Sequence, residues 1–356
     1  MDPFLAPRFR SDFEAAPLAL VDIGASGGLP PHWRVAARHL SVTGFEPDER
    51  EFHRLAASAP PGFRYLNTAL AETAGPLAFH LARRQMTSSC FAPDLDFLRR
   101  FPDHADYEPL KTVKLPAMGL DAALAEAAAA PGGEGDGSRA DDPDFVKLDI
   151  QGSELAVLRG GDATVRGPAA GLEIEVEFGP VYAGQPLFAD IDAHVRARGF
   201  QLFDLRPFRW KRTIGLRAGG PRGQIAFADA LYFKTPAALS AALTARPGDD
   251  TAERRRKLLR ALAAVAVYGY ADYVLELAAE TGGPATPQNP NGLGLLDAED
   301  QTALRAAAHA TRTPLAWLPD FRGRWRLSRM LRAWSDALDP GNRSFSTGEW
   351  TLGNRR

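Results

Sequence analysis

The sequence contains very little cysteine and no long apolar run. Cys90 is the only cysteine among 356 residues, so the chain cannot form an internal disulfide, and nothing points to an oxidising compartment. No segment approaches the roughly 18 consecutive apolar residues of a membrane-spanning helix. The chain begins Met1-Asp2-Pro3-Phe4, with an acid where a secretory signal peptide carries lysine or arginine. We therefore expect a cytoplasmic protein without a transmembrane segment.

The chain also lacks a surplus of basic residues. Its 42 Lys and Arg residues stand against 44 Asp and Glu residues, for a net charge of -2. A protein that binds nucleic acid through the phosphate backbone needs a basic surplus on one face, so we expect no nucleic-acid partner. The 45% hydrophobic and 24% charged content excludes disorder of the whole chain and allows one large domain plus a smaller one.

Short apolar segments alternate with amphipathic stretches from about residue 17 onward. This alternation is typical of a parallel sheet with helices on both faces. We predict an α/β fold, a doubly wound and mostly parallel sheet, followed by an all-helical C-terminal region. The expected strands are 18–23, 41–46, 63–66, 144–150, 172–178, 201–205 and 226–233. The expected parts are an N-terminal lead at 1–16, the sheet domain at 17–234 and the helical region at 235–356.

Two stretches interrupt the alternation. Residues 76–124 form a less regular insertion, and residues 131–142 are a glycine-rich polar tract that we expect to be a mobile loop, because it cannot bury enough apolar surface. In the helical region, Leu258–Tyr268 is apolar nearly all round and is expected to be buried. Arginines interleave with Trp, Leu and Met over 322–334, which favours a helix packed on the domain or, alternatively, a basic amphipathic surface. A homo-oligomer contact, if there is one, is expected in the helical region.

The first expected strand ends in a glycine-rich turn, Asp22-x-Gly24-x-x-Gly27-Gly28. Glycines let the backbone turn tightly and approach a ligand closely. An acid in the turn favours a cationic ligand over a pyrophosphate, and S-adenosylmethionine carries an ammonium and a sulfonium. Such turns also occur for packing alone. If the turn binds this cofactor, Asp22→Ala should weaken binding and leave the fold intact.

An acid also follows the second expected strand. Glu46, in Gly44-Phe45-Glu46-Pro47-Asp48, comes about 24 residues after Asp22, a spacing at which acids accept hydrogen bonds from ribose hydroxyls in nucleotide-binding folds. Either Glu46 or Asp48 could instead cap the next helix. We assign the ribose to Glu46 and the cap to Asp48.

A third segment carries the most specific motif. Residues 147–154 read K-L-D-I-Q-G-S-E and place Asp149 at the carboxyl end of an expected strand, where ligands of open α/β sheets bind. Together with the glycine turn, the Glu46 motif and Asn67-Thr68-Ala69, this order of motifs resembles the FkbM-type methyltransferase family over roughly residues 17–234. The resemblance implies a Rossmann-like, class I fold and an S-adenosylmethionine-dependent enzyme. It also implies O-methylation of a sugar, polysaccharide or secondary metabolite.

The resemblance implies residue roles as well. The glycine turn and the acid after the second strand bind the cofactor, the Asn-x-Ala segment lies by the adenine, and the 147–154 segment reaches the reactive end. Gln151 stands where many relatives have an acid. The implied cofactor-binding residues are Asp22, Gly24, Ala25, Ser26, Gly27, Glu46, Pro47, Asn67, Ala69 and Asp149.

The strand at 172–178 alternates apolar residues with three acids. A parallel strand buried on both faces should be apolar throughout, so the acids indicate either an exposed edge strand or a polar site against one face. Glu177, nearest the carboxyl end, is the candidate to contact the acceptor or act as a base, whereas Glu173 is expected in solvent. Asp149 and Glu177 are the predicted catalytic pair, one of which removes the hydroxyl proton.

The acceptor is expected to be a small molecule or glycan, in a pocket formed by the insertion and the helical region. Ser89, Glu154 and Glu177 are its predicted contacts, although Ser89 could equally lie in a turn. Asp149, Glu154 and Glu177 could also supply oxygen ligands to a divalent cation. Since no spacing of these acids is diagnostic, a metal is possible but not expected.

Two other functions fit parts of the sequence. A scaffold or binding protein could keep the fold without turnover. A nicotinamide-dependent oxidoreductase would use the same turn, but Ser26 occupies the second glycine position of the G-x-G-x-x-G pattern. Titration with S-adenosylmethionine and with NAD separates the three functions.

Overall fold

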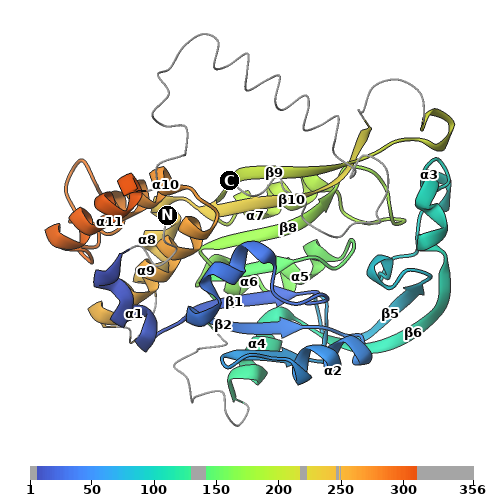
Figure 1. The fold of residues 1–356 in the computed structure, drawn as a ribbon, viewed down its shortest axis with the longest axis horizontal. Helices are drawn as coiled ribbons and strands as arrows, with labels where there is room; N and C mark the ends of the chain where they lie inside the picture. Colours follow the sequence, from blue (N-terminus) through green and yellow to red (C-terminus); the bar gives the residue numbers. More distant parts are fainter. Residues whose placement is uncertain (1–5, 130–141, 217–222, 246–247, 249, 311–356) are drawn as a thin grey trace.

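The computed structural model describes residues 6–129, 142–216, 223–245, 248 and 250–310. Its main sheet consists of β1 (Leu18–Ile23), β2 (Leu40–Phe45), β3 (Phe63–Leu66), β7 (Phe145–Leu148), β8 (Gly171–Glu177), β9 (Phe200–Trp210) and β10 (Gln224–Lys234). The strand order is β3-β2-β1-β7-β8-β10-β9 (Figure 1). Strand β10 runs in the opposite direction to the other six strands of this sheet. This confirms the predicted doubly wound, mostly parallel fold.

Helices cover both faces of this sheet. One face carries the apolar side chains Val21, Val146, Leu172 and Ile174 and packs against four helices, which are α4 (Leu120–Ala129), α5 (Glu154–Gly160), α6 (Asp162–Arg166) and α7 (Phe188–Arg196). The opposite face packs against the N-terminal and C-terminal helices, namely α1 (Arg10–Ala15), the 3-10 helix η2 (Pro31–His39), α8 (Pro236–Thr244), α9 (Thr251–Val267), α10 (Ala271–Glu280) and α11 (Ala298–Ala310).

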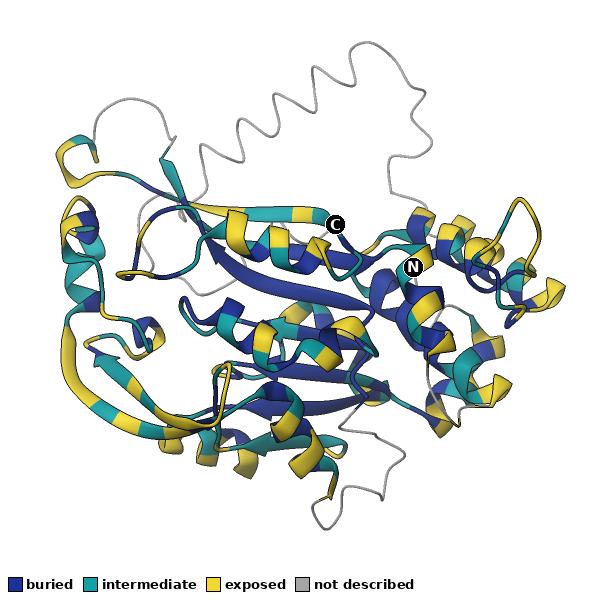
Figure 2. Cartoon of the chain, turned by 180° about the vertical axis from the view of Figure 1, so that it is seen from behind, coloured by how far each residue is buried: buried dark blue, intermediate teal, exposed yellow. Residues whose placement is uncertain are grey.

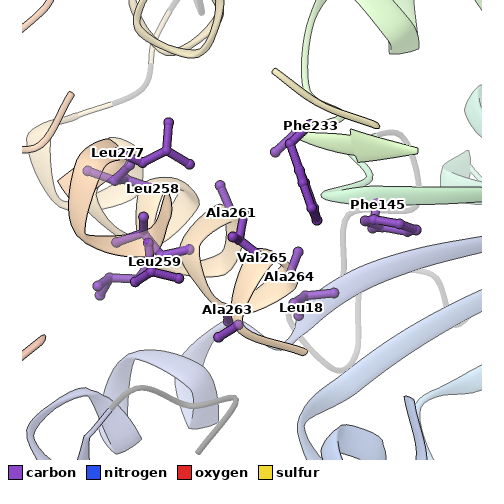
Figure 3. Close-up of a cluster of buried hydrophobic side chains, with 14 of the residues drawn as sticks. Leu18, Phe145, Phe233, Leu258, Leu259, Ala261, Ala263, Ala264, Val265 and Leu277 are labelled. Atoms are coloured by element: carbon purple, nitrogen blue, oxygen red, sulfur yellow. The ribbon is translucent and has the colours of Figure 1, made fainter. Parts of the chain in front are cut away.

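Helix α9 is the centre of the second core. Its residues Leu258 to Ala266 are all buried, as the apolar stretch predicted, because they contact both the sheet and the helices around them. Figure 3 shows Leu258, Leu259, Ala261, Ala263, Ala264 and Val265 of this helix in one cluster with Leu18, Phe145 and Phe233. Those three residues lie at the end of the sheet where the parallel strands begin, so the described C-terminal helices cover the amino-terminal end of the sheet.

Two buried cations fix α9 to that end. Lys257 Nζ lies 2.7 Å from Asp144 Oδ1, and Arg260 Nε lies 3.0 Å from Asp144 Oδ2. Asp144 directly precedes β7, and its Oδ2 also accepts the Ala19 N–H of β1 at 2.8 Å. Buried charges are tolerated when they are paired and hydrogen-bonded, so this cluster aligns α9 with β1 and β7.

The insertion lies on the other side of the molecule (Figure 1). It contains a small sheet of β4 (Ala69–Leu70), β6 (Pro109–Met118) and β5 (Gly75–Ala82), in that order, with η3 (Gln85–Thr87), α3 (Leu95–Leu98) and η4 (Pro102–Tyr107). Phe97, Phe101 and Tyr107 pack against Tyr182 and Trp210, which follow β8 and end β9. The insertion therefore covers the carboxyl-terminal end of the sheet.

Strand β8 corrects two predictions. It lies between β7 and β10 in the middle of the sheet, and every residue from Gly171 to Glu177 is buried; the central strands are dark blue in Figure 2. The alternative of an exposed edge strand was wrong because β10 and β9 extend the sheet beyond β8. Glu173 is not in solvent either, since it is only 2% exposed.

Some predictions fall on other parts of the chain. Residues 131–141 of the expected loop and the arginine-rich stretch at 322–334 lie outside the described residues. Within the described ranges, no helix combines the length and the apolar character needed to cross a membrane.

Candidate functional site

The turn after β1 is shaped by glycines with left-handed backbone angles. Gly24, Gly27 and Gly28 have φ values of +76°, +84° and +77°. A Cβ on Gly24 would lie 2.0 Å from the carbonyl oxygen of Asp149, whereas a Cβ on Gly27 would meet no atom within 4 Å. The turn therefore packs closely on the strand-end segment at Asp149 and faces open space at Gly27.

Helix α2 (Glu49–Ala57) holds the outer part of this turn. Glu51 Oε1 accepts the Gly27 N–H at 2.9 Å. The hydrogen bond from Arg54, followed by the one from Gly27, lowers the pKa of Glu51 to about 2 despite some burial. Asp48 accepts the N–H groups of Arg50 and Glu51 at 3.0 and 3.1 Å, so the predicted cap is confirmed. Glu51 was not among the predicted site residues, although an acid three residues after a cap is a known helix-start signal.

Asp22 and Lys147 form a buried ion pair beneath the turn. They are opposite residues of β1 and β7, with Lys147 Nζ 3.1 Å from Asp22 Oδ1 and 3.8 Å from Asp149 Oδ2. Burial raises the pKa of Asp22, and Lys147 opposes that rise. Burial alone would lower the pKa of Lys147, but Asp22, Asp149 and Glu173 together raise it. Asp22 thus already has a cation of its own, so we now expect its removal to destabilise the fold as well.

Glu46 lies beside the turn at the end of β2. Its Oε1 accepts the Asp48 N–H at 2.9 Å, and Asn67 Nδ2 donates to its backbone oxygen at 2.9 Å. Burial raises the pKa of Glu46 to about 7, and repulsion from Asp48, Glu51 and Asp22 adds to the rise. Asn67 and Glu46 are therefore brought together next to the turn. Of the other predicted cofactor residues, Ala25 and Ala69 are buried, Pro47 is half-buried and Ser26 is exposed.

Charged residues form two rows across neighbouring strands, on one face of the sheet and near its carboxyl end. In the first row, Asp22, Lys147 and Glu173 are lateral neighbours. Arg206 Nη2 lies 3.2 Å from Glu173 Oε2, and Tyr268, from the end of α9, donates to the same oxygen. Burial alone would raise the pKa of Glu173, but His32, Arg206 and Tyr268 lower it to about 2. This row pairs its acids with cations.

The second row is rich in acids. Glu175 of β8 is opposite Asp229 of β10, and Glu177 lies one step nearer the carboxyl end. Burial, followed by repulsion among the neighbouring acids, raises the pKa values of Glu175, Glu177 and Asp229 well above the ordinary range. Within the described residues, neither Glu177 Oε2 nor the nearby Gln185 Nε2 has a hydrogen-bond partner. Asp149 is the accessible member of this group, with 43% of its side chain exposed.

Two predicted acceptor contacts are instead occupied within the protein. Glu154 is fully buried, and its two oxygens accept the N–H groups of Ile150 and Gly152, both at 2.9 Å. Ser89 is also buried, and its Oγ donates to the backbone oxygen of Gln151 at 2.6 Å. Both side chains hold the segment 149–152 in place, so their geometry does not fit a direct contact with an acceptor.

From the helical region, Tyr268 donates to Glu173 of the first row, and the described helices pack on the same face nearer the amino-terminal end of the strands. The acceptor pocket formed by the insertion and the helical region stays a prediction. In the described part of the chain, no group of three or more His, Cys, Asp or Glu side chains is arranged to hold a metal ion.

The sequence matches the family model of the methyltransferase FkbM domain over residues 22–202. The match begins at Asp22, near the end of β1, and includes β2, β3, β7 and β8. Every predicted site residue named above lies within it. It covers just over half of the 356-residue chain. Comparison with curated proteins gives no match.

Several solved structures share distant similarity with the chain. A TehB-like SAM-dependent methyltransferase from Corynebacterium glutamicum is 11% identical, with 63% of this chain and 88% of that chain covered and a TM-score of 0.29. The 16S rRNA (adenine(1408)-N(1))-methyltransferase from Catenulisporales acidiphilia is 14% identical, with coverages of 66% and 94% and a TM-score of 0.28. The 1,6-didemethyltoxoflavin-N1-methyltransferase from Burkholderia thailandensis, with S-adenosylhomocysteine bound, is 13% identical, with coverages of 65% and 79% and a TM-score of 0.27. At these values the similarity assigns no residue of this chain to a role.

Proposed function

Because the chain belongs to the FkbM methyltransferase family, we propose that it methylates a hydroxyl of a sugar, polysaccharide or secondary metabolite with S-adenosylmethionine as the donor. The observation that carries this proposal is the glycine turn. It is closed against Asp149 at Gly24, open at Gly27, and bordered by Glu46 and Glu51. A close backbone approach and nearby carboxylates suit a cationic nucleoside.

The residues around the turn fit this cofactor. Glu46 has one oxygen fixed by the Asp48 N–H, and its other oxygen would accept the ribose hydroxyls. Asn67 and Ala69 would lie by the adenine, with Ala25 and Pro47 beside it. The exposed residues Ser26 and Gly27 would present the backbone of the turn. When bound, the cofactor supplies an activated methyl group on a positively charged sulfur.

The acids at the carboxyl end would act on the acceptor. Burial raises the pKa of Glu177, which favours its protonated form, and a protonated Glu177 would donate a hydrogen bond to an acceptor oxygen. Asp149 is more exposed and is the better placed of the predicted pair to remove the hydroxyl proton, a role worth roughly 10² to 10⁴ in rate. Asp149 would also face the positive sulfur, since the turn at Gly24 packs on its backbone.

Calorimetric titration of the full chain with S-adenosylmethionine, and separately with NAD, tests the cofactor. Binding of S-adenosylmethionine alone is expected, and no heat from either ligand would favour a scaffold without turnover. Mass spectrometry of glycans and metabolites from cells with and without the protein tests the acceptor, with one methyl group missing in its absence. Restoration by the native chain but not by Asp149→Asn is expected, and equal restoration would remove Asp149 from the mechanism.

A further inference from the structure

Gln151 has an unusual backbone in the segment after β7. Its φ is +60°, and among the described residues it is the only non-glycine with a positive φ. This left-handed conformation is unfavourable for a residue with a Cβ, and glycine follows directly at position 152. The surrounding contacts must therefore hold Gln151 in place, and such residues concentrate at functional sites.

Those contacts use every part of the Gln151 amide. Its Nε2 donates to Glu175 Oε2 at 2.6 Å and, more weakly, to Asp149 Oδ1 at 3.4 Å. Its Oε1 accepts from the Tyr182 hydroxyl at 2.9 Å. An ionised acid here could accept from Tyr182 but could not donate to two carboxyl groups.

Gln151 also connects the sheet to the insertion. Its backbone oxygen accepts from Ser89 Oγ, and the Tyr182 hydroxyl that contacts its side chain lies 2.9 Å from the backbone oxygen of Thr87. Ser89 and Thr87 belong to the insertion, which covers the carboxyl end of the sheet. A single residue thus links Asp149, just after β7, and Glu175 of β8 to the element that would enclose the acceptor.

We infer that Gln151 is a positioning residue. It holds Asp149 and Glu175 in one arrangement beside the glycine turn, because its amide donates to these acids and accepts from Tyr182 at any pH. This inference rests on the proposed function, since it assumes that Asp149 faces the cofactor.

Replacement by an acid makes the inference measurable. In Gln151→Glu, a protonated carboxyl can still donate to Glu175 and accept from Tyr182, whereas an ionised one repels both neighbouring acids. The surroundings favour the protonated form, because burial and charges of the same sign raise a carboxyl pKa. The titratable groups around position 151 are Asp149, Glu154, Glu175, Glu177, Asp229, Tyr107 and Tyr182.

The test uses S-adenosylhomocysteine, whose sulfur is neutral, as the calorimetric probe for the full chain. Relative to the native chain, Gln151→Glu should bind nearly as well at about pH 5.5 and at least about tenfold more weakly at about pH 8. Gln151→Met, which has no donor, should bind weakly at both pH values. Gln201→Glu is the matched control, because Gln201 lies on β9 and contacts Tyr273 of α10, far along the strand from the site. Its affinity relative to the native chain should be the same at both pH values.

Equal affinity of Gln151→Glu and the native chain at about pH 8, or the same loss at both pH values, would overturn the inference. Thermal unfolding of the same proteins without ligand separates this failure from failure of the proposed function. The difference in Tm between the native chain and Gln151→Glu should widen as the pH rises. If the native chain binds neither the cofactor nor the probe, the proposed function fails, while the Tm series still decides the role of Gln151.

Discussion

Replacing Asp22 by asparagine should destabilise the whole fold. The substitution keeps the shape of the side chain but leaves the Lys147 ammonium in the sheet without its closest counter-charge, which now lies 3.1 Å away. Removal of one partner from a buried ion pair typically costs about 3–5 kcal/mol, because a buried charge remains unpaired. Lys147 keeps Asp149 at 3.8 Å and the Gly24 carbonyl oxygen at 3.5 Å, so we expect about 2–4 kcal/mol.

Urea unfolding followed by circular dichroism gives the free energies of unfolding of Asp22→Asn, Lys147→Met and the double variant. Since the double variant leaves no unpaired charge, it should lose clearly less than the sum of the single losses. The exposed pair of Arg83 and Glu108, whose Nη2 and Oε2 are only 2.7 Å apart, is the control, and Glu108→Gln should leave the free energy of unfolding nearly unchanged. A loss in Asp22→Asn no larger than in this control, or strictly additive losses, would refute the reasoning.

Three further predictions concern the turn and the two rows of acids. Gly24→Ala should raise the calorimetric Kd for S-adenosylmethionine at least about tenfold, because the new Cβ would lie 2.0 Å from the Asp149 backbone oxygen. The control Gly215→Ala, whose Cβ would meet no atom within 4 Å, should leave this Kd unchanged. Glu173 has a folded pKa of about 2 against an ordinary 4.5, so its ionised form stabilises the fold by at most about 3 kcal/mol. This stabilisation is complete above the ordinary pKa and is lost as the pH falls toward 2. Glu173→Gln should therefore unfold at a lower urea concentration at neutral pH, and an unchanged loss of stability below pH 4.5 in this variant would contradict the pairing. Burial raises the pKa of Glu46 to about 7, so affinity for S-adenosylmethionine should increase from about pH 6 to about pH 8 as this carboxyl ionises, and in Glu46→Gln it should not.

The sequence predicted the architecture well because its strongest patterns are local. The apolar strands, the glycine turn and the acid cap at Asp48 each depend on a few adjacent residues. The buried stretch of α9 was also predictable, since Leu258–Tyr268 has no polar face. The family motifs added the connection between segments that are far apart in the chain, from Asp22 to Asp149.

Sequence reasoning failed where the partner of a polar side chain comes from a distant element. The alternation of β8 left open whether its acids face solvent or a site, and only the pairing with β10, in which Asp229 lies opposite Glu175, places them inside. Glu154 and Ser89 have side chains typical of an active site, yet both are used up by backbone groups of the segment 149–152. No local pattern shows such contacts, nor the link from Tyr268 to Glu173.

The alternation of β8 has a consequence for the alignment of strands during folding. A shift by one residue would turn its acids toward the apolar helices on the other face. A shift by two residues would keep the faces correct but would move Glu173 to the position of Gly171, where even a Cβ would lie 2.6 Å from the Phe145 ring and 2.8 Å from the Phe233 ring. Burial of charge thus disfavours the one-residue shift of β8, and the lack of space at Gly171 disfavours the two-residue shift. The acids that would serve the reaction also select the native pairing.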